Sequence, residues 1–207
     1  MKQLIFKLIL YFKKLQQLNY RPLHNKFIHK QTPFYSQKQT GTKNKLEDKL
    51  WRENGCGLAC LKMILGAKKR SAPSLVSLGR LAQKYGCYIE NPKAKHGMDG
   101  LFYKPFLIFI EKEFNLRGKI LSPMTIQDII EALDNKKYVL ASVSPEVRNL
   151  RGRPKQPGGH LVLITGYEWD KKIFIFNNPS YIKTQENQEI RFKNFSCFFA
   201  KRGLVIN

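Results

Sequence analysis

The sequence predicts an α+β fold in which an N-terminal helical part is followed by a mostly antiparallel sheet. Apolar residues recur at helical spacing between residues 56 and 134, whereas β-rich apolar runs dominate from residue 138 onward. Helices that precede strands in this way predict segregated layers. With 207 residues, 43% hydrophobic and 12% aromatic, the chain can bury one substantial core.

Four segments have helical spacing: residues 56–65, 73–85, 99–114 and 125–134. The first stops at Gly66, and the second opens with Pro73, which is favoured in a first helical turn. Pro105 weakens the third segment because a proline inside a helix removes a hydrogen bond. These segments make up the expected helical part.

The strands are expected at residues 138–143, 160–167 and 172–177, with shorter runs near 189–192 and 203–206. The second and third of these strands are joined by a short polar connection. They should therefore form a hairpin, which brings the end of the third strand back beside the start of the second.

Residues 1–45 differ in composition from the rest of the chain. They contain ten Lys or Arg and no acidic residue, and their apolar stripe is confined to residues 4–15. We interpret them as a basic N-terminal extension, a short helix followed by an irregular arm, outside a domain at residues 46–207. A solvated tail without a partner, an organelle presequence and a helix lying on an anionic membrane are all consistent with this composition.

The net charge of +22 favours an anionic partner, but no recognition motif supports nucleic acid as that partner. Four scattered cysteines are too few for a disulfide framework, and the histidines and cysteines form no metal-ligand pattern. No apolar run is long enough to span a membrane, and no ATP-binding motif occurs. We therefore expect no metal or other cofactor, and a cytoplasmic location with membrane association as the alternative.

Cys56 is the candidate nucleophile. The sequence Gly-Cys-Gly leads directly into an apolar helix, so Cys56 should lie at the helix N-terminus, where the dipole and free amides favour a thiolate. Its own backbone N–H could donate to an oxyanion. A cysteine is also often a small buried apolar residue, which is our interpretation of Cys60, Cys87 and Cys197.

His160 is the candidate general base, because it begins an apolar strand directly after Gly158 and Gly159. The hairpin should bring an asparagine beside it to fix the tautomer of the ring. Asn178 is our choice and Asn177 is the alternate. The order Cys, His, Asn on a helix followed by a sheet is papain-like.

Together these motifs resemble the papain-like peptidases that process double-glycine leader peptides, in their stand-alone form. The resemblance rests on Cys56-Gly57-Leu58-Ala59-Cys60-Leu61, Gly159-His160-Leu161-Val162 and Asn178-Pro179, and it covers about residues 46–207. It implies a papain-like fold, a Cys56–His160–Asn178 triad, a peptide or protein substrate and cleavage after small residues.

Two departures from that family's pattern matter. The family usually has Asp at the position of Asn178, and it has a Gln a few residues before the nucleophile as an oxyanion donor. The nearest upstream Gln is Gln39, so Asn54 is the substitute that we consider. Loss of such a donor costs on the order of 100- to 1,000-fold in rate.

The loop at residues 145–158 is basic and precedes His160. Arg151 and Arg153 are therefore candidate contacts for an acidic substrate segment, together with Gly158 and Gly159 at the mouth of the strand. A solvated loop explains the same charges. The rival functions are a weak or inactive peptidase-like module that binds an anionic partner, and acyl transfer by the same triad.

Overall fold

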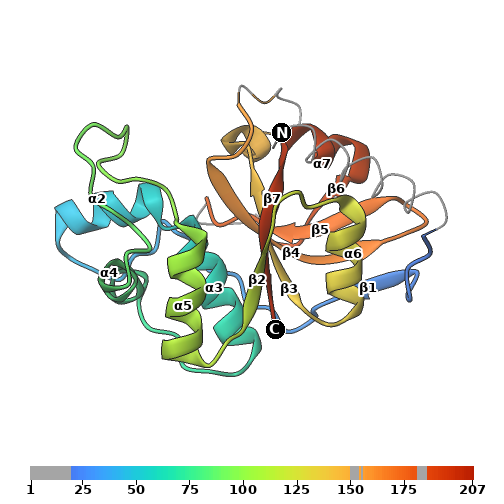
Figure 1. The fold of residues 1–207 in the computed structure, drawn as a ribbon, viewed down its shortest axis with the longest axis horizontal. Coiled ribbons are helices and arrows are strands. Elements are labelled where there is room, and N and C mark those ends of the chain that lie inside the picture. The colour runs from blue at the N-terminus through green and yellow to red at the C-terminus, as the bar shows by residue number, and fades with distance from the viewer. Residues whose placement is uncertain (1–19, 150–153, 155, 181–185) are drawn as a thin grey trace, which may run out of the picture.

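The computed structural model describes residues 20–149, 154, 156–180 and 186–207 (Figure 1). The strands are β1 (Lys26–Ile28), β2 (Gly118–Leu121), β3 (Tyr138–Val143), β4 (His160–Glu168), β5 (Ile173–Asn177), β6 (Gln188–Arg191) and β7 (Phe199–Ile206). The helices are α2 (Lys45–Asn54), α3 (Cys56–Ala67), α4 (Leu75–Lys84), α5 (Tyr103–Phe114), α6 (Ile126–Asp134) and α7 (Phe192–Phe198), with a short 3₁₀ helix at Pro145–Arg148.

The seven strands form one sheet in the order β2-β7-β3-β4-β5-β6, and β1 pairs with β4 outside that path. Every strand pairing is antiparallel. Helices α2 to α5 gather on one side of the sheet, whereas α6 and α7 cover the other (Figure 1). The predicted α+β class, with helices first and a mostly antiparallel sheet, is confirmed.

The sheet is buried on both faces, which explains why its strands are continuous apolar runs. Leu140, Leu163 and Leu204 pack with the helices α2 to α5. Val139 and Val162, which alternate with those leucines along β3 and β4, pack in a second core with α6 and α7. The central strands therefore join two cores, and side chains at their ends are held rigidly.

Helix α5 begins at Tyr103, later than the expected start at residue 99. Pro105 then lies in the first turn, where a missing backbone N–H breaks no intrahelical hydrogen bond. The proline marks the start of this helix and does not interrupt it.

The structure differs from the expected boundary at residue 45. Strand β1 pairs with β4, and Thr32, Ser36, Gln37 and Thr40 are buried. The boundary itself falls inside α2, which Asn44 caps by accepting hydrogen bonds from two backbone N–H groups. These buried residues are polar, so they leave no periodic apolar pattern in the sequence from which their packing could be predicted. The helix expected near residues 4–15 lies outside the described residues.

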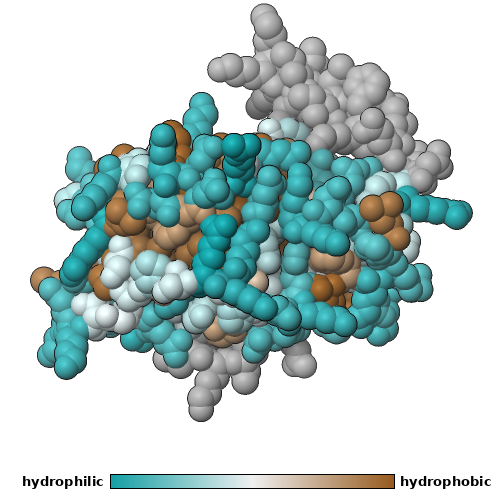
Figure 2. Space-filling view, turned by 90° about the horizontal axis from the view of Figure 1, so that it is seen from below, coloured by the Kyte–Doolittle hydropathy of each residue, from teal (hydrophilic) through white to brown (hydrophobic). Residues whose placement is uncertain are grey.

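Within the described part of the chain, no helix is long and apolar enough to cross a membrane. The face seen in Figure 2 is largely hydrophilic, with apolar side chains between the polar ones.

Candidate active site

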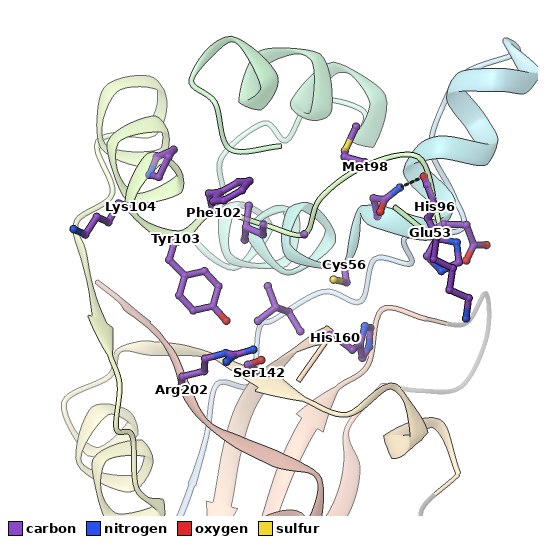
Figure 3. Close-up of a pocket in the computed structure, with 17 residues that line it drawn as sticks. Glu53, Cys56, His96, Met98, Phe102, Tyr103, Lys104, Ser142, His160 and Arg202 are labelled. Atoms are coloured by element: carbon purple, nitrogen blue, oxygen red, sulfur yellow. Dashed lines mark hydrogen bonds between the residues drawn. The ribbon is translucent and has the colours of Figure 1, made fainter. Parts of the chain in front are cut away.

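A cleft of about 690 Å³ lies between the helices and the sheet. Its lining includes Cys56 from α3, Tyr103 from α5, Ser142 from β3, His160 from β4 and Arg202 from β7 (Figure 3). The structure thus brings together a thiol and an imidazole that lie far apart in the sequence.

Cys56 is the first residue of α3, as the sequence predicts, and Gly55 precedes it without any side-chain cap. The side chain is partly exposed in the cleft. Cys60 and Cys87 are fully buried, in agreement with a packing role. Cys197 differs from that expectation, because it lies exposed on α7.

The helix N-terminus does not by itself make Cys56 a thiolate. Burial raises the pKa of the Cys56 thiol, whereas the nearby backbone N–H groups of Leu161 and Gly57 lower it. The positive charge of Arg148 also lowers this pKa. Because burial is the largest effect, the free site holds a protonated thiol at neutral pH.

His160 is 3% exposed at the first position of β4. Burial lowers its pKa to about 4, an effect that the hydrogen bond to Asn178 opposes and that the charges of Arg148 and Lys38 increase. The imidazole is therefore uncharged at neutral pH and can accept a proton.

Asn178, not Asn177, meets the histidine. The Oδ1 atom of Asn178 lies 2.8 Å from Nε2 of His160 and also accepts from the backbone N–H of Ser180 at 3.2 Å. Since a carbonyl oxygen only accepts, Nε2 carries the proton and Nδ1 remains the basic nitrogen. Asn177 makes a different contact: its Oδ1 accepts a hydrogen bond from the backbone N–H of Asn187.

Ser180 is a second partner of the imidazole that the sequence analysis missed. Its Oγ lies 3.0 Å from Nε2 of His160, and the residue is 4% exposed. The residues before the helical part support the same loop, since the backbone N–H of Gln37 and the hydroxyl of Ser36 both donate to the carbonyl of Pro179. The position of Ser180 beside His160 depends on the tertiary packing of residues 36–37 against residue 179, so the sequence alone could not reveal it.

The structure does not leave Asn54 free to serve as the side-chain oxyanion donor. Asn54 lines the cleft, but its Nδ2 donates to the carbonyls of Leu50 and His96 at 2.8 and 3.1 Å. Both amide hydrogens are thus engaged. Gln37, two residues before Gln39, donates one Nε2 hydrogen to the carbonyl of Arg52 at 2.7 Å.

The glycines around Cys56 serve packing. A Cβ atom on Gly57 would lie 2.7 Å from Leu101, and one on Gly55 would lie 2.9 Å from Leu75. Both glycines let a leucine side chain approach the start of α3. The space beside these glycines is therefore occupied and does not lie open above the thiol.

Of the candidate substrate contacts, Gly159 lines the cleft, whereas Gly158 is buried behind it. Arg151 and Arg153 lie outside the described residues. Tyr103, Ser142 and Arg202 are cleft residues that the sequence analysis missed, because no local motif marks them. Within the described ranges, no group of His, Cys, Asp or Glu side chains could hold a metal ion.

Comparisons with known proteins support the same fold. The model of the Peptidase_C39 like family matches residues 29–204. The fold is similar to that of a C39-like peptidase from Bacillus anthracis, with a TM-score of 0.58, 12% identity, and coverage of 88% of this chain and 97% of that one.

Two other solved structures are more distant. The peptidase domain of Streptococcus ComA, a bifunctional ABC transporter involved in quorum sensing, gives a TM-score of 0.48 at 13% identity over 74% of this chain and 90% of that one. UfSP from C. elegans gives 0.52 at 10% identity over 93% of this chain and 36% of that one. A comparison with the curated proteins finds no match.

Proposed function

Because the chain belongs to the Peptidase_C39 like family, we propose that it is a cysteine peptidase with Cys56 as nucleophile, His160 as general base and Asn178 as the orienting residue. The observation that carries this proposal is the 2.8 Å hydrogen bond from His160 to Asn178 in the cleft that also holds Cys56. Peptide or protein segments are the substrates, and the reaction needs no cofactor.

The reaction follows from the protonation states. Uncharged His160 accepts the proton of Cys56 at Nδ1 as the sulfur attacks the carbonyl carbon of the substrate. The backbone N–H of Cys56 donates to the resulting oxyanion. His160 then protonates the leaving amine, and water hydrolyses the thioester with the same histidine as base.

The geometry of the site predicts slow catalysis. Asn54 offers no free amide hydrogen to the oxyanion, and removal of one such donor typically costs on the order of 100-fold or more. Burial also disfavours both ions of a thiolate–imidazolium pair. These two observations favour, as the second candidate, a module with little activity that binds an anionic partner through its net positive charge.

A peptide-library cleavage profile tests the proposal. Wild-type protein should cut a subset of peptides, with Gly or Ala before the cut, and Cys56→Ala should cut none. His160→Ala should abolish cleavage, and Asn178→Ala should reduce it less. His96→Ala is the matched control, because His96 lines the same cleft and takes no part in the proposed chemistry. If the wild-type protein is inactive and its Cys56 also fails to react with electrophilic peptides, the result would favour the second candidate, the binding module.

A further inference from the structure

One end of the cleft carries a polar group that the proposed chemistry does not use. Tyr103, Ser142 and Arg202 lie together there, away from Cys56 and His160 (Figure 3). Burial raises the pKa of the Tyr103 hydroxyl, whereas the neighbouring Ser142 and Arg202 lower it. Because Tyr103 starts α5 and the other two lie on the sheet, this group joins both walls of the cleft.

The backbone is shaped to admit the guanidinium of Arg202. Gly158 has a φ of +81°, and a Cβ atom at this position would lie 2.7 Å from Nη2 of Arg202 and 3.2 Å from Oγ of Ser142. Any other residue would therefore be strained and would push the arginine away. The same glycine that precedes the His160 strand thus lets Arg202 lie in the wall of the cleft.

Arg202 has no carboxylate partner among the described residues. The residues outside them include no Asp or Glu at all. Glu53 is the acidic residue among those that line the cleft, and Lys38 pairs with it at 2.9 Å. Lys95 and Lys104 also line the cleft, so its field is positive.

We propose that Arg202 is a specificity-determining residue that binds an acidic side chain of the substrate within a few residues of the cleaved bond. An arginine offers N–H donors in a planar fork that matches a carboxylate in two parallel hydrogen bonds. Tyr103 lines the cleft beside this fork, and Gly158 leaves room for it. The apolar Leu101, Phe102 and Leu161 line the rest of the cleft. This inference rests on the proposed function, since it names the substrate class of the same site.

The test uses paired decapeptides with Gly-Gly at the centre and one Glu or Gln at each remaining position in turn. For at least one position, wild-type protein should cleave the Glu peptide roughly two- to fivefold faster in kcat/KM than the Gln peptide, the discrimination expected of one ion pair at an exposed arginine. Arg202→Gln should abolish the preference, and Arg202→Glu should reverse it. Lys201→Gln is the matched control, since it removes the same charge from an exposed neighbour on β7 outside the cleft lining.

Binding to the Cys56→Ala variant separates this inference from the proposed function. Fluorescein-labelled Glu peptides should bind this variant more tightly than their Gln partners, and the difference should vanish in the Cys56→Ala, Arg202→Gln double variant. That result supports acidic recognition even if no peptide is cleaved, in which case the peptidase proposal alone fails. Equal binding of Glu and Gln peptides at every position, or a preference that persists in Arg202→Gln, would overturn the role of Arg202.

Discussion

Replacing His160 by glutamine should remove a specific pH dependence of protein stability. The ordinary pKa of the imidazole is 6.5, and burial lowers it to about 4 in the folded protein. Between these values the unfolded chain binds a proton that the folded protein does not. The free energy of unfolding must therefore fall as the pH falls through this window, and it recovers as the pH rises.

The size of the effect follows from the two pKa values. Relative to neutral pH, a histidine with these values lowers the free energy of unfolding by about 1 kcal/mol near pH 5.5, and by about 3 kcal/mol near pH 4. His160 is 3% exposed, so solvent screens this effect little. A glutamine side chain has no titrating proton in this range, so the His160→Gln variant should lose this part of the slope.

Urea unfolding of both proteins at neutral pH and near pH 5.5 measures the effect. The difference between wild type and His160→Gln cancels the other titrating groups, because they are common to both. His96→Gln serves as a control variant from the same cleft, with an exposed side chain. Parallel pH dependence of wild type and His160→Gln would refute the buried, uncharged state of His160 and the base role that depends on it.

Three further outcomes are expected. Iodoacetamide should label both Cys56 and the exposed Cys197, but peptide mapping should show that only labelling of Cys56 slows when the base is removed. Asn178→Asp should raise the pKa of the histidine 2.8 Å away and so extend labelling of Cys56 to lower pH. Deletion of residues 1–45 should lower the melting temperature by about 10 °C or more, because β1 and several buried hydrogen bonds are lost, whereas deletion of residues 1–19 should chiefly weaken salt-sensitive binding to anionic vesicles. Base-dependent labelling of Cys197 would contradict the first expectation, and unchanged labelling of Cys56 in Asn178→Asp would contradict the second. An unchanged melting temperature without residues 1–45 would contradict the third.

The sequence allowed the central strands and most helices to be predicted, because a sheet buried on both faces and amphipathic helices leave strong apolar patterns. Strands β1 and β2 and helices α2 and α7 were not predicted. Lys26–Ile28 is too short for a periodic signal, and it becomes a strand only because β4 offers it an edge. The segment at residues 36–40 is held by polar contacts such as Ser36 to Pro179, which no apolar pattern marks.

The same distinction separates the parts of the site. Cys56, His160 and Asn178 sit at the starts or ends of regular elements, so a hairpin argument could bring the last two together. Ser180 and Arg202 depend on how two remote segments meet. Whether Asn54 can donate to an oxyanion could be decided only from distances in the structure, because these show that Asn54 already uses both of its amide hydrogens.

The neutral side chain of Asn178 beside the imidazole is consistent with the positive charges near His160. An aspartate there would favour an imidazolium, but Arg148 and Lys38 disfavour that charge on His160. Arg148 at the same time favours ionisation of Cys56. The positive field therefore acts in opposite senses on the two groups, stabilising a thiolate while keeping the base uncharged. With a neutral amide at residue 178, proton transfer from Cys56 must await the developing negative charge of the substrate carbonyl, and the free site stays a neutral pair.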